Sequence, residues 1–124
     1  TIKCVLTPGH TAGVLSLFIT LEDNGKKIVA AMHGGIGFNS MEKNFLEKYG
    51  LSFSCRTQFK ESLGKLTGEQ VDIVLGNHPE QTKTLQKMIK VFSGESIIDP
   101  DEWQNFIQYN ERRINKFLRE HPEQ

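Results

Sequence analysis

The Asn24-Gly25 pair, which lies between two runs of apolar residues, constrains the fold of this chain more than any other feature. An Asn-Gly pair between strand-like segments is the strongest short-range signal for a β-hairpin, because both residues tolerate a positive φ. The preceding run covers residues 14–21 and the following run covers residues 27–32. We therefore expect an antiparallel hairpin whose first strand places on one face Leu15, Leu17, Ile19 and Leu21.

Two more strands are predicted from short runs rich in Ile, Val and Leu, over residues 1–6 and 71–75. Helices are predicted over residues 41–49, 51–66, 80–92 and 100–119. The first has Asn39 and Glu42 as an N-cap with its reciprocal partner and ends at Gly50, and the last begins with Asp99 as N-cap and Pro100 at its first position.

The apolar side chains of the three longer predicted helices recur at helical spacing, so each helix should bury one stripe. The stripe of the helix over 51–66 comprises Leu51, Cys55, Phe59 and Leu63. That of the helix over 80–92 comprises Leu85, Met88, Ile89 and Phe92. The last helix contributes Trp103, Phe106, Ile107, Ile114, Phe117 and Leu118.

The order of these elements predicts a layered α/β (α+β) unit in which a mostly antiparallel sheet has one helical layer. The helices can cover one face of the sheet. The other face must meet a further partner or stay exposed as an apolar patch. Neither an internal repeat nor a low-complexity segment divides the 124 residues, which we interpret as one unit.

Composition excludes several classes of function. Fifteen Lys and Arg balance fifteen Asp and Glu, so no overall field favours nucleic acid or an anionic membrane. No apolar run is long enough to span a bilayer, and no signal peptide opens the chain, which begins at Thr1 without an initiator Met. The compartment is therefore not indicated. Cys4 and Cys55 match no metal or redox spacing and are expected to be buried free thiols.

Two segments have the same form, in which a strand ends, small or stiff residues turn the chain, and a histidine follows. They are Leu6-Thr7-Pro8-Gly9-His10 and Leu75-Gly76-Asn77-His78-Pro79. A metal ligand needs this arrangement, because the strand end fixes the imidazole and the loop leaves space for an ion. We therefore predict that His10 and His78 face a shared gap, although a single loop histidine has many other uses.

The motif Thr7-Pro8-Gly9-His10-Thr11-Ala12-Gly13 resembles the Thr-Pro-Gly-His-Thr-Pro-Gly signature of metallo-β-lactamase-fold hydrolases. The segments 71–79 and 98–103 resemble the late strand and last helix of lactamases of the third subclass. The resemblance implies the C-terminal half of a four-layer αββα sandwich, with His10 and His78 as ligands of the first and second metal. It also implies zinc, up to two ions, and a small-molecule substrate such as a carbonyl, thioester or phosphoester compound.

The sequence departs from the family pattern in two ways. The His-X-His-X-Asp-His motif of the N-terminal half is absent, so the missing half or a second copy of the chain is the expected partner, and no catalytic residue is assigned here. Gly35, in the loop that begins at Gly34, stands where the family has a bridging Asp. His33 could compensate as a ligand, or be an exposed loop histidine, and Asn77 is a candidate ligand or ligand neighbour.

Other interpretations of these residues are weaker. The glycine-rich loop 34–37 lacks both nucleotide-binding spacings, and no Gly-X-Ser-X-Gly motif is present. The cationic residues Arg112, Arg113, Lys116 and Arg119 are expected to form the solvated face of the last helix. Two hypotheses remain: part of a metal-dependent hydrolase, which the intact His10 and His78 favour, or a non-catalytic binding or assembly domain with a degenerate metal site, which Gly35 favours.

Overall fold

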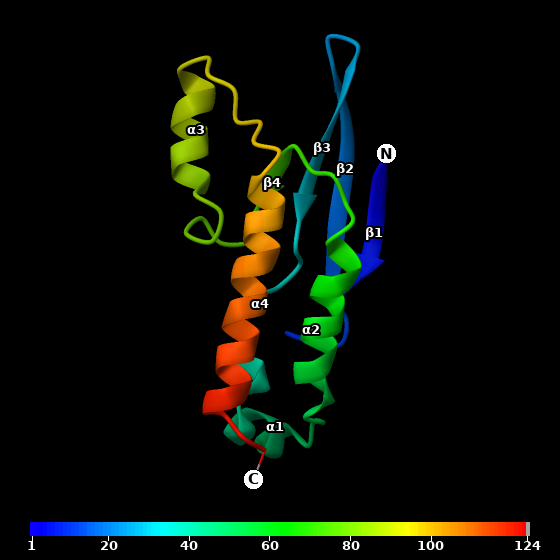
Figure 1. Cartoon of the computed structure of the whole chain (residues 1–124), viewed down its shortest axis with the longest axis vertical. Helices are drawn as coiled ribbons and strands as arrows, with labels where there is room; N and C mark the ends of the chain where they lie inside the picture. Colours follow the sequence, from blue (N-terminus) through cyan, green and yellow to red (C-terminus); the bar gives the residue numbers. More distant parts are fainter. Residues whose placement is uncertain (124) are drawn as a thin grey trace.

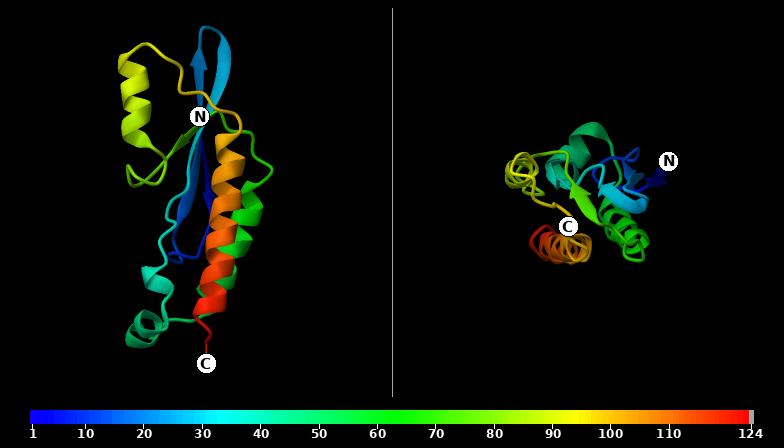
Figure 2. Two further views of the ribbon diagram at one scale, coloured as in Figure 1. Left: turned by 60° about the vertical axis from the view of Figure 1, so that its left-hand side comes forward. Right: turned by 90° about the horizontal axis from the view of Figure 1, so that it is seen from above.

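The computed structural model describes residues 1–123, which form one four-stranded sheet with helices along one of its faces (Figures 1 and 2). The strand order in the sheet is β1-β2-β3-β4. The strands are β1 (Ile2–Leu6), β2 (Leu15–Asp23), β3 (Lys26–Met32) and β4 (Ile73–Leu75).

The predicted hairpin is confirmed. β2 pairs antiparallel with β3 from Leu17↔Met32 to Asp23↔Lys26, and Asn24 and Gly25 both have positive φ, at 49° and 78°. β1 is also antiparallel to β2, whereas β4 is parallel to β3. Since β1, β3 and β4 consequently point the same way, the loops that follow them leave from the same end of the sheet.

The helices occupy the predicted regions with shifted starts. They are the 3-10 turn η1 (Asn39–Met41), α1 (Lys43–Tyr49), α2 (Ser54–Leu66), α3 (Thr84–Phe92) and α4 (Glu102–Glu120). The predicted N-caps are wrong: Asn39 lies inside η1, and the cap positions of α1 and α4 are Glu42 and Asp101. Asp99, three residues before the first residue of α4, instead accepts a hydrogen bond from the backbone N–H of Asp101.

α2 and α4 lie side by side over one face of the sheet (Figure 2). Between them and the sheet lies a core in which Phe18 meets Trp103 edge-on with ring centroids 5.7 Å apart. Trp103 also stacks on Phe106 and donates its indole N–H to the carbonyl of Leu66. The core includes Phe18, Ala31, Ile36, Met41, Phe59, Leu63, Leu66, Val71, Val74, Trp103, Ile107, Ile114 and Phe117. The stripe predicted for the last helix is thus confirmed.

The opposite face of the sheet is open. The strand register places on it every second residue of each strand, because side chains alternate between faces. No helix within residues 1–123 lies across this face in either view (Figure 2). We call it the open face. Its apolar members are Ile2, Cys4, Leu6, Leu15, Leu17, Ile19, Leu21, Ile28, Ala30, Met32, Ile73 and Leu75, and the pair Asp23↔Lys26 lies on it at the hairpin tip. Of these residues, Ile28 and Ala30 are buried.

The apolar stripe of α3 is not buried, which contradicts the sequence prediction. Leu85, Met88, Ile89 and Phe92 are all exposed, Phe92 by 83%. α3 stands beyond the β4 edge of the sheet (Figure 1) and is fastened by Lys87, which donates to the carbonyl of Val74 and pairs with Glu102 at 2.7 Å. The polar side of the helix therefore faces the body of the molecule and the apolar side faces outward.

Three smaller predictions are also wrong. Cys4 is exposed on the open face, and Cys55 is only partly buried. Leu51 precedes α2 and is exposed. Arg113 is half-buried rather than solvated: its guanidinium lies 4.3 Å from the ring centroid of Phe38 and bonds to the carbonyl of Ile36. Among residues 1–123, no helix has the length and apolar character needed to cross a membrane.

Candidate functional site

The site expected around His10 begins with the loop that follows β1. Thr7 is buried, and its backbone N–H and hydroxyl bond to Val14 and Ser16. Gly9 lies against α2 so closely that a Cβ there would come within 2.6 Å of the Cα of Phe59. Only glycine fits this approach, which explains why a Gly precedes the histidine. The loop is therefore rigidly placed, and His10 with it.

The ring of His10 is held by the glycine-rich loop that follows β3. Its Nδ1 lies 2.8 Å from the carbonyl oxygen of Gly37, and its own carbonyl accepts a hydrogen bond from the Ser40 hydroxyl. Because a carbonyl only accepts, Nδ1 must carry the proton. The lone pair of the neutral imidazole is then on Nε2, which bonds to none of residues 1–123.

Gly35 packs directly beneath this ring. A Cβ at position 35 would lie 2.8 Å from Cδ2 of His10, so a side chain here would displace the imidazole. The loop itself is also anchored from the helical layer, since Arg113 bonds to the carbonyl of Ile36. Ser40 and Arg113 were not among the predicted site residues, because no sequence motif links them to His10.

The loop that follows β4 reaches the same glycine-rich loop from the other side. Asn77 is exposed and donates its side-chain N–H to the carbonyl of Gly34. His78 follows directly and is exposed. His10 and the neighbour of His78 thus both contact the loop 34–37, at one end of the sheet. That the two rings face one gap stays a prediction.

His33 is buried, so the expectation of an exposed loop histidine is wrong. Its Nδ1 accepts the backbone N–H of Gly35 at 3.1 Å, and its Nε2 has no partner among residues 1–123. The rings of Phe59 and Phe106 lie 6.0 and 6.3 Å away. Burial, with a smaller effect of His10, lowers the pKa of His33 to about 4. A ligand role for His33 would require its ring to leave the Gly35 hydrogen bond.

No three or more His, Cys, Asp or Glu side chains in the described part of the chain are grouped so as to hold a metal ion. A structural zinc site needs four protein ligands and a catalytic one about three. The described residues therefore do not by themselves form a site of this kind.

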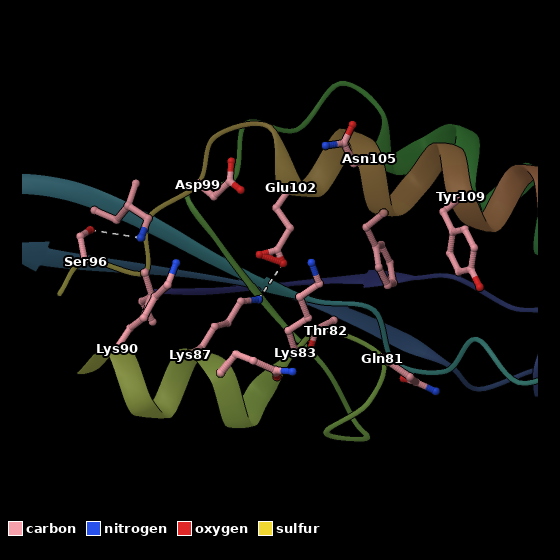
Figure 3. Close-up of a pocket in the computed structure, with 14 residues that line it drawn as sticks. Gln81, Thr82, Lys83, Lys87, Lys90, Ser96, Asp99, Glu102, Asn105 and Tyr109 are labelled. Carbon is pink, nitrogen blue, oxygen red and sulfur yellow. Dashed lines mark hydrogen bonds and ion pairs between the residues drawn. The ribbon is translucent and has the colours of Figure 1, made fainter. Parts of the chain in front are cut away.

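A separate cavity lies between α3, the segment 96–99 and α4 (Figure 3). It measures about 460 Å³. Lys83, Lys87 and Lys90 point toward it from α3 and its N-cap, and the Lys87–Glu102 pair crosses it (Figure 3). None of the four histidines lines it, so it is separate from the candidate metal site.

Comparison with solved structures shows which known fold this chain matches. The FEZ-1 metallo-β-lactamase of Legionella gormanii matches 96% of this chain with a TM-score of 0.81 and 26% sequence identity. The chain has part of the metallo-β-lactamase fold. BJP-1 of Bradyrhizobium japonicum, a subclass B3 enzyme, matches with a TM-score of 0.79 at 18% identity. The metallo-β-lactamase of Cronobacter sakazakii matches with a TM-score of 0.81 at 22% identity.

The chain covers 45% of the FEZ-1 and BJP-1 chains and 48% of the Cronobacter one, so it spans about half the length of these structures. The expected fold class is therefore confirmed as about half of the metallo-β-lactamase fold. No protein-family model and no curated protein matches the sequence.

Proposed function

We propose that this chain supplies His10 and His78 as donors to the metal site of a metal-dependent hydrolase, and that the remaining donors come from polypeptide outside these 124 residues. The orientation of His10 carries the proposal. Metal-ligating histidines almost always donate their other ring N–H to a carbonyl, a carboxylate or water, which fixes the tautomer and the ring. The bond from Nδ1 to the Gly37 carbonyl is of this kind and leaves the lone pair on Nε2.

The topology supports the pairing of His10 with His78. Both follow strands that finish at the same end of the sheet, and both loops contact the glycine-rich loop. The matched proteins are metallo-β-lactamases by name. Zinc is the ion that imidazole donors of this kind suit, and when bound it supplies a Lewis acid for hydrolysis of a small molecule such as a carbonyl, thioester or phosphoester compound.

Metal binding tests the proposal without requiring activity. The full chain is titrated with zinc by calorimetry, and with cobalt by absorption, since imidazole ligation changes the cobalt spectrum. We expect weak binding, because two imidazoles are too few for a closed site. His10→Ala and His78→Ala should each weaken it by about tenfold or more, since each removes one donor.

His121→Ala is the matched control, since His121 stacks on Phe117 and is held by the carbonyl of that residue. It should leave metal binding unchanged. If His10→Ala and His78→Ala bind zinc as tightly as the unaltered chain, or if His121→Ala weakens binding equally, His10 and His78 are not donors and the proposal is wrong.

The second candidate is a non-catalytic binding or assembly domain with a degenerate metal site. The packing of His10 on Gly35 favours it, because the bridging Asp that the resemblance implies at position 35 would displace the His10 ring. In this case neither zinc nor cobalt binds the full chain above the level seen with the His10→Ala variant.

A further inference from the structure

The glycine-rich loop 34–37 is held in place by side chains. It belongs to no helix or strand, and among residues 1–123 no backbone–backbone hydrogen bond of a loop or turn involves it. Instead, the backbone of each of its four residues bonds to one side chain from outside the loop. In loop order these side chains are Asn77, His33, Arg113 and His10. The position of the loop therefore depends on these four contacts.

Arg113 makes the contact that comes from the helical layer. Its Nη1 donates to the carbonyl of Ile36 at 3.1 Å and to Oδ1 of Asn110 at 2.7 Å. The guanidinium also lies 4.3 Å from the ring centroid of Phe38. Asn110 is completely buried, and its own amide N–H donates to the carbonyl of Phe106 at 2.9 Å. Asn110 and Phe38 therefore fix the orientation of Arg113 toward the loop.

The charge of Arg113 strengthens this contact. Among residues 1–123 no carboxylate pairs with its guanidinium. Burial lowers the pKa of Arg113, because a half-buried cation is less well solvated. Its donors are directed at a backbone carbonyl and a buried amide oxygen, and a bond from a charged donor is stronger than one between neutral groups. Asn77, which binds the neighbouring Gly34, is neutral and exposed and is the weaker restraint.

The restraint at Ile36 extends to the carbonyl that holds His10. The peptide group between Ile36 and Gly37 is planar, so the bond to the Ile36 carbonyl fixes the whole plane. Only φ and ψ of Gly37 then separate this plane from the Gly37 carbonyl, which faces Nδ1 of His10 at 2.8 Å. Because glycine adopts more backbone conformations than any other residue, the Gly37 carbonyl keeps its direction only while its neighbours are fixed.

We propose that Arg113 is a positioning residue that sets the tautomer of His10. The guanidinium holds the loop, the Gly37 carbonyl keeps the proton on Nδ1, and Nε2 retains its lone pair. A ring nitrogen that carries a proton cannot bind a metal ion, so the tautomer decides whether Nε2 is available. The use of this lone pair at a metal site rests on the proposed function, whereas the tautomer itself does not.

Long-range 1H–15N correlation spectra of the 15N-labelled full chain measure the tautomer of each histidine, at about pH 8, where imidazoles are neutral. His10 should show the proton on Nδ1, and its signals are assigned with His10→Ala. Two other histidines serve as internal references. His121 should also carry Nδ1–H, because its Nδ1 lies 3.1 Å from the Phe117 carbonyl. His33 should show the opposite form, because its Nδ1 accepts the N–H of Gly35.

Arg113→Met removes the bond to Ile36 and should lower the ratio of Nδ1–H to Nε2–H at His10 by about tenfold or more. The signals of His121 should stay unchanged, which shows that α4 is intact. Arg113→Lys keeps a charged donor and should retain more of the Nδ1–H form than Arg113→Met. Arg112→Met is the matched control, because Arg112 is the adjacent residue of α4 and is exposed.

Asn110→Leu provides a second test, because it leaves the charge of Arg113 in place and removes the oxygen that orients it. It should shift His10 in the same direction, and circular dichroism checks the fold of every variant. Three outcomes would overturn the proposal: His10 protonated on Nε2 in the unaltered chain, His10 unchanged in the folded variants of Arg113 and Asn110, or an equal shift in Arg112→Met.

Zinc titration separates this inference from the proposed function. If the unaltered chain binds zinc, Arg113→Met should weaken binding by about tenfold, the usual effect of removing a residue that orients a ligand. If the unaltered chain binds no zinc while Arg113→Met shifts the His10 tautomer, the proposed function is wrong and Arg113 still positions His10.

Discussion

Lowering the pH from 7.5 to 4.5 should destabilise the folded chain through His33, and replacing His33 by Asn should remove most of this pH dependence. The pKa of His33 in the folded chain is about 4, below the ordinary value of 6.5, because burial disfavours the imidazolium. Between these two values the unfolded chain binds the proton and the folded chain does not. The stability contributed by the neutral ring is therefore complete above pH 6.5 and is lost as the pH falls toward 4.

The magnitude follows from the shift. One pKa unit corresponds to about 1.36 kcal/mol, so a drop from about pH 7.5 to about pH 4.5 should lower the free energy of unfolding by roughly 2.5 kcal/mol through His33 alone. Asn keeps an oxygen that accepts the Gly35 N–H, which now bonds to Nδ1 of His33. The variant loses packing against Phe59 and Phe106, but this loss is the same at both pH values and cancels in the difference.

Urea unfolding followed by circular dichroism measures the free energy of unfolding at both pH values, at one fixed protein concentration. Unaltered chain and His33→Asn should differ by roughly 2.5 kcal/mol in their response to pH. His121→Asn removes a different histidine and should respond like the unaltered chain. If His33→Asn keeps the full pH response, the buried His33 does not remain neutral in the folded chain and the reasoning fails.

Two further predictions concern packing. Gly9→Ala should lower the free energy of unfolding by about 1–3 kcal/mol, because a Cβ there meets the backbone of Phe59 at 2.6 Å. Gly13→Ala is the control and should cost far less, since a Cβ at Gly13 has nothing within 4 Å. Equal effects of the two variants in thermal unfolding would contradict the close approach of Gly9 to Phe59. Lys87→Met should speed hydrogen exchange of the α3 amides by about tenfold or more, because it removes a charge-assisted bond to Glu102 and a bond to the Val74 carbonyl. Lys90→Met, on the same helix, is the control and should leave the exchange rates unchanged. Similar exchange in both variants would show that Lys87 does not hold α3.

The parts of the fold that depend on local chemistry could be predicted from the sequence. The hairpin follows from Asn24-Gly25, and the alternation in β2 correctly placed Leu15, Leu17, Ile19 and Leu21 on one face. The loop 7–13 was assigned from its resemblance to a family motif, and the structure adds the physical reason for one of its residues, the contact of Gly9 with α2.

The parts of the fold that depend on contacts between residues far apart in the sequence could not be predicted. An apolar stripe shows that a helix is amphipathic, but not that the chain contains a surface to bury it, and α3 has none among residues 1–123. For His33, the sequence left open a ligand role or an exposed loop histidine. It is instead buried, with the rings of Phe59 and Phe106, from two distant helices, beside it. Arg113 was assigned to the surface. No local sequence pattern shows that its guanidinium lies against the Phe38 ring and bonds to the Ile36 carbonyl.

The parallel pairing of β4 with β3 has a consequence for the order of folding. β1, β2 and β3 form a meander whose contacts are close in sequence, whereas the partners Ala30 and Ile73 are separated by α1 and α2. Closing that long segment costs chain entropy before the new contacts repay it, so β4 should join the sheet late. His10 is carried by the early meander and His78 by the late strand. A chain that stalls before the crossover closes would therefore display only one of the two histidines at the end of the sheet.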